Sequence, residues 1–369
     1  MTPTGWPGPD RDPESGPVET SARRPGPTGW IGRSAEGSEV SVPADEDEAV
    51  NDVADSRETA VAEPQPEPAL PVLPAGLADT PIAAAIADAT RRRAVLKTVE
   101  VRRPAAPRVL TVANQKGGVG KTTTTVNVAA ALAQSGLRVL VIDIDPQGNA
   151  STALGVDHHA EVPSIYDAVV DDLPLREVIH ACPDIANLWC VPATIDLAGA
   201  EIELVAMVSR ETRLKRALQA YFDETDPDEA FDYVFIDCPP SLGLLTVNAF
   251  VAAGEVFIPI QSEYYALEGL SQLLHNIELI RAHLNPNLQV STILLTMYDA
   301  RTRLSAQVAE EVREHFPDQV LKACIPRSVR ISEAPSHGQT VMTYEPSSTG
   351  ALSYLEAAKE LAGRAAGYR

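Results

Sequence analysis

A glycine-rich run at residues 113–123, which reads ANQKGGVGKTT, constrains the fold of this 369-residue chain more than any other feature. An apolar, β-branched run at residues 108–112 precedes it and predicts a buried strand, and residues 122–133 predict a helix that Gly136 closes. Glycines between a strand and a helix turn backbone N–H groups toward an anion, and the helix N-terminus adds partial positive charge there. The run therefore predicts a phosphate-binding loop.

The charged and hydroxyl residues of the loop indicate a nucleotide bound with a metal ion. Lys121 places a full charge near the β- and γ-phosphates, and the Thr122 hydroxyl is of the type that ligates Mg²⁺. The residues expected to contact the nucleotide are Gly117, Gly118, Val119, Gly120, Lys121, Thr122 and Thr123.

The loop departs from the general phosphate-binding pattern at its start. Gln115 occupies a position where that pattern has glycine, and a second lysine, Lys116, follows it. A side chain at this end of the loop points away from its own nucleotide, so we expect Lys116 to neutralise the phosphates of a neighbouring subunit. The alternative is an ordinary solvated lysine.

Carboxylates follow two further apolar runs. Residues 138–143 predict a strand that ends in Asp143 and is followed by Asp145, and residues 233–236 predict a strand that ends in Asp237. The carboxyl ends of strands are where doubly wound folds place their ligands. We expect Asp237 to hold Mg²⁺ directly or through water, and one of the two earlier carboxylates to reach the metal through a shared water. Taken alone, the Asp-Pro sequence after residue 144 would equally fit a turn that caps the next helix.

Apolar runs at residues 256–260 and 292–296 predict more buried strands, and an amphipathic helix at residues 267–284 lies between them. This alternation predicts an α/β fold with a mostly parallel, doubly wound sheet flanked by helices, as in P-loop nucleotide hydrolases.

The sequence between the second and third predicted strands is less specific. It predicts a helix at residues 164–179, a short strand at 187–192 and a long amphipathic helix at 198–221. Four cations toward the end of the long helix would suit the negative end of its dipole; they are Arg210, Arg213, Lys215 and Arg216.

The chain divides into an arm and one domain. Residues 1–80 contain 13 of the 30 prolines and 16 acidic against 5 basic residues, so we expect a disordered, acidic, proline-rich arm. Residues 81–107 predict a short basic helix and a linker, with Thr80 as cap and Pro81 in the first turn. This segment is either the end of the linker, a docking peptide for a partner protein or a basic strip near DNA. Residues 108–369 form the compact domain.

Cysteine usage and hydropathy indicate a cytoplasmic protein. The four cysteines form no Cys-x-x-Cys pair, so neither a zinc site nor a disulfide framework is indicated. No apolar run of about 18 residues and no signal peptide is found.

With its second lysine at residue 116, the loop resembles that of the deviant Walker A ATPases, the family of ParA (Soj) chromosome- and plasmid-partitioning proteins, with MinD-like and nitrogenase-iron-protein-like relatives. The resemblance covers about residues 108–365. It implies ATP and Mg²⁺ as cofactors, Asp145 as the residue that orients the attacking water and reaches Mg²⁺ through a shared water, and hydrolysis to ADP and phosphate. Residues 201–216 correspond to a region that helps to form the dimer.

The resemblance also implies partners and a cellular place. They are a homodimer formed with ATP, nonspecific double-stranded DNA on the nucleoid, and a ParB-type centromere-binding protein that stimulates hydrolysis. A polar scaffold protein is a further candidate partner for the arm, with polar localisation as its consequence.

Base and DNA contacts are carried over from the same resemblance. The residues expected at the nucleobase are Met297, Asp299 and Pro326, and those expected at DNA are Arg301, Arg303, Lys322, Arg327 and Arg330. Residues 108–369 carry a net charge of −14, so DNA binding must rest on a local patch that contacts phosphates without reading sequence. Charge alone would favour scattered solvated arginines.

Three other functions remain open. A MinD-type membrane ATPase would need an amphipathic, membrane-inserting C-terminal helix, and the alanine- and glycine-rich residues 354–369 make a poor anchor, so no membrane insertion is expected. An ATP-dependent amide ligase would need a pocket for a substrate carboxylate, of which the sequence shows no sign. A nucleotide-gated scaffold would turn over almost no ATP.

Overall fold

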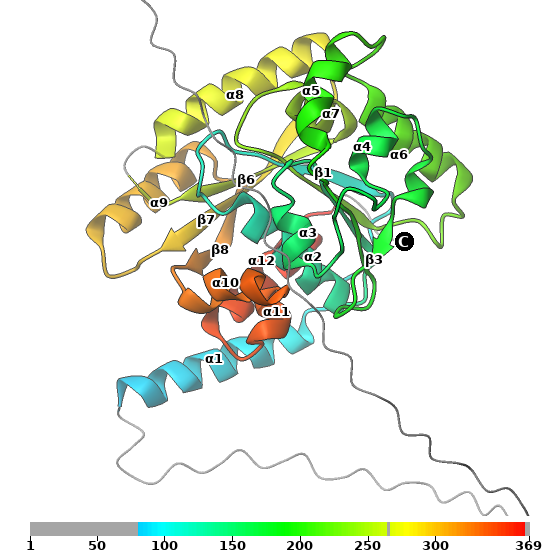
Figure 1. Ribbon diagram of the computed structural model, residues 1–369. Helices are drawn as coiled ribbons and strands as arrows, with labels where there is room; N and C mark the ends of the chain where they lie inside the picture. Colours follow the sequence, from blue (N-terminus) through cyan, green and yellow to red (C-terminus); the bar gives the residue numbers. More distant parts are fainter. Residues whose placement is uncertain (1–79, 264–265, 366–369) are drawn as a thin grey trace, which may run out of the picture. The chain divides into compact units, whose positions relative to one another are not determined.

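The structure is a computed structural model that describes residues 80–263 and 266–365 (Figure 1). The predicted arm therefore lies outside the described residues, apart from Thr80. Within the described ranges no helix has both the length and the apolar character needed to cross a membrane.

An eight-stranded sheet with the order β3-β4-β2-β5-β1-β6-β7-β8 forms the centre of the fold. Every pairing is parallel except that of β3 with β4, which is antiparallel. The predicted fold class, a mostly parallel sheet flanked by helices, is confirmed. The strands are β1 Arg108–Val112, β2 Val139–Asp143, β3 His180–Ala181, β4 Leu188–Val191, β5 Tyr233–Asp237, β6 Glu255–Gln261, β7 Gln289–Tyr298 and β8 Val320–Pro326.

Helices cover both faces of the sheet (Figure 1). On one face lie α4 Ile165–Val169, α5 Leu197–Val205, α6 Arg213–Glu224, α7 Leu244–Ala252, α8 Ala266–His283 and α9 Arg303–His315. On the other lie α2 Lys121–Gln134, α3 Asn149–Ala153, α10 Val329–Glu333, α11 Val341–Tyr344 and α12 Thr349–Gly363. The short 3₁₀ turns are η1 Leu175–Glu177 and η2 Ala334–His337, and α1 Pro81–Thr98 precedes the sheet.

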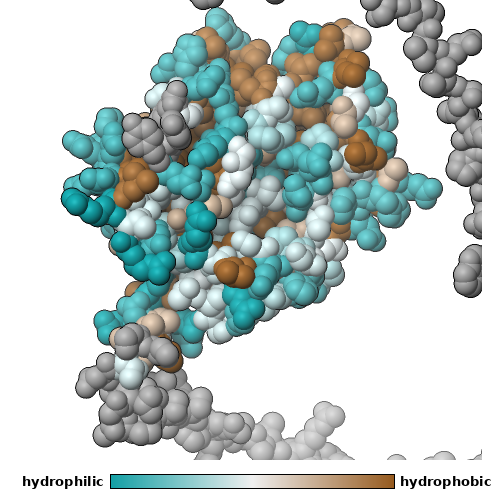
Figure 2. All heavy atoms as spheres, turned by 60° about the vertical axis from the view of Figure 1, so that its left-hand side comes forward, coloured by the Kyte–Doolittle hydropathy of each residue, from teal (hydrophilic) through white to brown (hydrophobic). Residues whose placement is uncertain are grey.

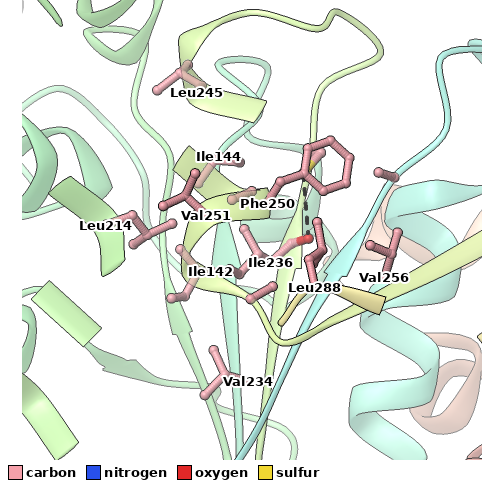
Figure 3. Close-up of a cluster of buried hydrophobic side chains, with 14 of the residues drawn as sticks. Ile142, Ile144, Leu214, Val234, Ile236, Leu245, Phe250, Val251, Val256 and Leu288 are labelled. Atoms are coloured by element: carbon pink, nitrogen blue, oxygen red, sulfur yellow. Dashed lines mark hydrogen bonds between the residues drawn. The ribbon is translucent and has the colours of Figure 1, made fainter. Parts of the chain in front are cut away.

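Alternate residues of the strands supply two separate apolar cores, as the period of two in a strand requires. Ile142 and Ile236 belong to the core beneath α4–α9, whereas Val141 and Phe235 belong to the core beneath α2 and α12. Figure 3 shows part of the first core, in which these two isoleucines lie beside Val251 of α7. Because both faces are covered, the strands read as continuous apolar runs in the sequence.

The predicted helix at residues 164–179 is wrong beyond its first turn. Only α4 forms, and the chain then turns at Asp172, which has a positive φ of 58°. Pro174 caps the short turn η1, after which the chain enters β3. A side chain in the left-handed region and a proline both interrupt a helix, and their effect outweighed the apolar spacing.

The predicted helix at residues 198–221 is two helices, α5 and α6, separated by residues 206–212. Ser209 in the break has a positive φ of 55°. Arg213, Lys215 and Arg216 thus stand at the start of α6, and Arg210 lies in the break, so none of them stands at the end of one long helix. Arg213 is buried and donates to the carbonyls of Val169 and Val170, the last turn of α4, so its charge does meet a helix C-terminus, but that of another helix.

The segment that contains α1 packs against the domain. Arg92 donates to both carboxylate oxygens of Glu356 in α12, at 2.7 and 2.6 Å. Lys359 of α12 donates to the carbonyls of Leu96 and Val99 at the end of α1, at 2.6 and 2.9 Å. Helix α1 is therefore a docked element of the domain.

Figure 2 shows the side of the domain that lies on the left in Figure 1; hydrophilic side chains predominate there, and apolar ones form separate groups. All four cysteines are free, with Cys182, Cys190 and Cys238 buried and Cys324 partly so. No group of three or more His, Cys, Asp or Glu side chains with metal-site geometry occurs in the part of the chain that the structure describes.

Candidate nucleotide-binding site

The glycine-rich loop joins β1, the central strand between β5 and β6, to α2. Gly118 and Gly120 have φ values of 75° and 88°, a left-handed conformation that residues with a Cβ rarely adopt. Gly120 is the N-cap of α2. No atom lies within 4 Å of the position that a Cβ would take at Gly117, Gly118 or Gly120, so open space faces the loop. An anion can thus approach the backbone N–H groups at the helix N-terminus.

Asn114 fixes the start of the loop. Its Nδ2 donates to the carbonyl of Pro259 in β6 at 2.9 Å, and its Oδ1 accepts from the backbone N–H of Lys116 at 3.0 Å. The hydroxyl of Thr296 in β7 donates to the carbonyl of Val119 at 2.8 Å. Hydrogen bonds to the strands β6 and β7 therefore hold the loop.

A pocket of about 510 Å³ lies in front of the loop. Of the residues predicted to contact the nucleotide, those that line the pocket are Gly117, Gly118, Gly120, Lys121, Thr122, Thr123, Asp145 and Met297. Sequence reasoning missed Val126, Gln147, Asn149, Thr152, Ala153, Pro240 and Pro335, which also line it. The signal for two of them was present, since Gln147 and Asn149 follow Asp145 in the turn after β2.

Thr122 and Asp237 meet at the floor of the pocket. The Thr122 hydroxyl donates to Oδ2 of Asp237 at 2.7 Å, and the Thr125 hydroxyl donates to Oδ1 at 2.8 Å. Asp237 is fully buried, and burial, followed by the nearby Asp143 carboxylate, raises its pKa. A hydroxyl and a carboxylate at this separation form the hard oxygen donor set that Mg²⁺ prefers, so the residues present fit that ion.

The two carboxylates after β2 have separate roles. Asp143 is fully buried and accepts from the Ser151 backbone N–H and hydroxyl at 2.9 and 2.8 Å, which ties the turn to α3. Burial raises the pKa of Asp143. Asp145 lines the pocket and accepts from the Gln147 backbone N–H at 3.1 Å. Of this pair, Asp145 is the carboxylate placed to act on a bound molecule.

The two lysines of the loop point to different places. Lys121 is buried and lines the pocket near Asp237 and Asp145, and burial lowers its pKa. Lys116 lies outside the pocket lining, and its Nζ is 3.2 Å from Oε2 of Glu263. The Lys116 side chain is 36 % exposed, so this ion pair is open to solvent.

The structure separates the three residues predicted at the nucleobase. Met297 lines the pocket and has a φ of 50°. Asp299 is engaged by Arg301, at 2.9 and 2.8 Å, which lowers the pKa of Asp299 to about 2. Pro326 ends β8 beside Tyr298 and is not part of the pocket lining.

Of the cations predicted at DNA, Arg301, Arg303 and Arg327 lie near the carboxyl ends of β7 and β8, and Lys322 lies apart from them. Arg301 and Arg327 both lower the pKa of Asp299, and these residues follow the carboxyl ends of β7 and β8. Arg303 is the first residue of α9, two residues after Arg301. Arg330 in α10 pairs with Glu333 at 3.1 Å. Lys322 stands apart in the middle of the edge strand β8.

Comparison with known proteins places this site in a family. A family model described as an AAA domain matches residues 107–290. The sporulation initiation inhibitor protein Soj of Bacillus subtilis is 55% identical over 255 residues, which are 69% of this chain and 98% of Soj. The chromosome partitioning protein ParA of Myxococcus xanthus is 50% identical over 257 residues, which are 70% of this chain and 88% of that protein.

Solved structures share the fold. Cobyrinic acid a,c-diamide synthase from Mycobacterium smegmatis, with bound ADP and magnesium, is 38% identical with a TM-score of 0.59 and covers 71% of this chain and 99% of its own. The cell division ATPase MinD of Pyrococcus furiosus is 28% identical with a TM-score of 0.56 and covers 69% and 98%. The chain is at least half identical to Soj and ParA over most of their lengths, and it belongs to the ParA (Soj) family of chromosome-partitioning ATPases.

Proposed function

We propose that this protein is an ATP-dependent DNA-segregation ATPase. In this proposal it binds ATP with Mg²⁺, dimerises, holds DNA without regard to sequence, and releases it after hydrolysis that a ParB-type centromere-binding protein stimulates. The pocket in front of residues 117–123 supports the proposal most directly, because Lys121, Thr122 and Asp145 line it and the Thr122 hydroxyl donates to the buried Asp237.

The loop, Asp145 and Asp237 have different roles in this proposal. The backbone N–H groups of residues 117–122 and the Lys121 ammonium bind the phosphates, and Thr122 and Asp237 would hold Mg²⁺. When bound there, the ion would supply positive charge that offsets the negative charge of the phosphates. Asp145 orients the attacking water from the wall of the pocket.

Lys116 supplies a charge in trans. Its side chain leaves the loop on the outer side and is part-exposed beside Glu263. Two copies that close face to face would bring each Lys116 to the phosphates of the other subunit, where a flexible cation stabilises transition-state charge as an arginine finger does. The dimer is then the species that hydrolyses ATP.

An apolar surface beside the loop supports a dimer of this kind. Its side chains are Ile195, Ile202, Val205, Val208 and Leu242, which are 67%, 80%, 59%, 86% and 42% exposed. Leu242 lies in the same small hollow as Asn114 and Gln115 at the start of the loop. Clustered exposed apolar side chains mark interaction sites, and burial in an ATP-dependent dimer would cover this one.

Co-sedimentation with nonspecific DNA of several lengths, with ATP, ADP or no nucleotide and at two salt concentrations, tests the proposal. We expect binding with ATP alone, weakened by salt because phosphate contacts release counterions. Absence of DNA binding in every nucleotide state would refute it. ATP-dependent flotation with anionic vesicles would instead support a membrane function of the MinD type, and glutamine- and ATP-dependent amide formation would support a synthase.

A further inference from the structure

We propose that α1 is a fixed DNA-backbone-binding surface that extends the cationic patch of the ATPase domain. The surface, here called the α1 cationic face, consists of the exposed Arg91 and Lys97 on α1, with Arg93 one turn before Lys97. The inference rests on the proposed DNA binding and adds to it the segment that carries part of the contact.

Helix α1 is held too firmly to be a passive linker. The bidentate pair of Arg92 with Glu356 fastens its middle, and the two bonds from Lys359 fasten its end. Beyond the helix, Arg103 donates to Oδ1 of the buried Asp232 at 2.8 Å. Leu96 is 8% exposed. A charge on a fixed helix loses less conformational entropy on binding than a charge on a flexible chain.

The cations of this face lack acidic partners. Arg91 and Lys97 are exposed, and no carboxylate pairs with either among residues 80–263 and 266–365. Arg93 donates to the backbone carbonyls of Pro346 and Ser347, which orient the guanidinium and leave its charge uncompensated. By contrast, Arg92 is paired with Glu356 and faces the domain. The exposed cations are therefore available to an anion.

The charge of the segment is opposite to that of its surroundings. Residues 81–107 contain 6 basic and 2 acidic residues, a net charge of +4, whereas residues 108–369 carry −14. A positive island on an acidic protein concentrates a polyanion locally although the whole molecule repels it at long range. A charged linker does not need to be held against the domain, as α1 is.

The α1 cationic face adjoins Arg330, one of the cations that we expect at DNA. The Arg330 guanidinium lies against the Tyr344 hydroxyl at the end of α11, and Arg93 holds the carbonyls of Pro346 and Ser347 a few residues later. The turn at residues 344–347 thus separates the two arginines, and a duplex backbone can contact both sides of it.

The test is charge reversal at two exposed positions that make no hydrogen bond in the described structure, in the full-length protein. The variant is Arg91→Glu with Lys97→Glu. Its matched control is Arg281→Glu with Arg313→Glu, exposed cations on α8 and α9, which changes the net charge by the same amount. Both are assayed by ATP-dependent DNA co-sedimentation across a salt series, with the thermal unfolding midpoint and DNA-free ATPase rate as checks of folding.

We expect the α1 variant to bind DNA about tenfold or more weakly than the control, with a log K against log salt slope shallower by roughly 2–4 for a dimer, since each phosphate contact contributes about 0.9. Equal DNA affinity of variant and control overturns the inference and leaves the proposed function standing. Stronger binding by the variant also overturns it, because the face would then serve the acidic arm or another protein. If the unsubstituted protein binds no DNA with ATP, both proposals fail.

Discussion

Single residues decide how the site holds its charges. Asp237 is buried with both oxygens occupied by threonine hydroxyls, and the single Thr125 hydroxyl proton is shared between Asp237 and the carbonyl of Lys121, 3.0 Å away. Only Thr122 belongs to the loop motif. Thr125 has no signal of its own in the sequence, because its role depends on the face of α2 that packs over β5. The different roles of Asp143 and Asp145 likewise depend on Ser151, which lies eight residues after Asp143 in the sequence.

Replacing Thr125 by valine keeps the shape of the side chain and removes one hydrogen bond to a buried carboxylate. We expect the free energy of unfolding to fall by about 1–3 kcal/mol, the range for a buried group that loses a partner, measured by urea denaturation without nucleotide. Thr90→Val is the control, since that hydroxyl bonds only the Ile86 carbonyl at an exposed site. Equal losses in the two variants would contradict this account of Asp237.

Replacing Lys116 by alanine tests the charge that the loop places outside its own pocket. We expect the ATPase rate of the dimeric state to fall by about a hundredfold or more, as when a charge that stabilises the transition state is lost. ATP binding by the monomer, measured with a fluorescent analogue, is expected to stay within about twofold, because Lys116 is absent from the pocket lining. The control is Arg281→Ala, an exposed cation on α8. An unchanged rate in Lys116→Ala would show that the lysine is merely solvated.

At the scale of elements, the loop, most of the strands and the helices α2 and α8 followed from the sequence, whereas β3, β8 and the helices between β2 and β5 did not. Apolar runs such as residues 233–236 can be read locally, because a strand buried on both faces needs nothing else. The break between α5 and α6 turns on a backbone conformation at Ser209 that a hydrophobic pattern does not record. The docking of α1 turns on Glu356 and Lys359, more than 250 residues away along the chain.

The pair of Arg92 with Glu356 offers a measure of how firmly α1 is held. A double-mutant cycle with Arg92→Ala and Glu356→Ala is expected to give a coupling energy of about 1 kcal/mol, since the pair is bidentate and only 31% and 24% exposed. The exposed pair of Arg102 and Glu100 is the comparison and is expected to give a value near zero. Both come from denaturant unfolding. A coupling near zero for the first pair would mean that α1 is loosely attached.

At the scale of the whole molecule, the apolar surface on α5 and its neighbours has a consequence for assembly. Ile202→Asp with Val208→Asp places two charges where a partner subunit would bury apolar side chains. We expect ATP-dependent dimerisation, followed by sedimentation velocity, to weaken at least about tenfold. Leu279→Asp on α8, an apolar residue that is 47% exposed, should leave the dimer intact. Equal dimerisation of the two proteins would place the interface elsewhere.

The contacts of α1 with the rest of the domain also decide where the chain can be shortened without exposing buried residues. A chain shortened to begin at residue 108 would lose Arg103 and leave the Asp232 carboxylate without that partner, and it would uncover the surface of α12 that Arg92 and Leu96 contact. Such a chain would match the length of the relatives and yet tend to aggregate. For crystallisation or calorimetry, a starting point just before Thr80 keeps these contacts together.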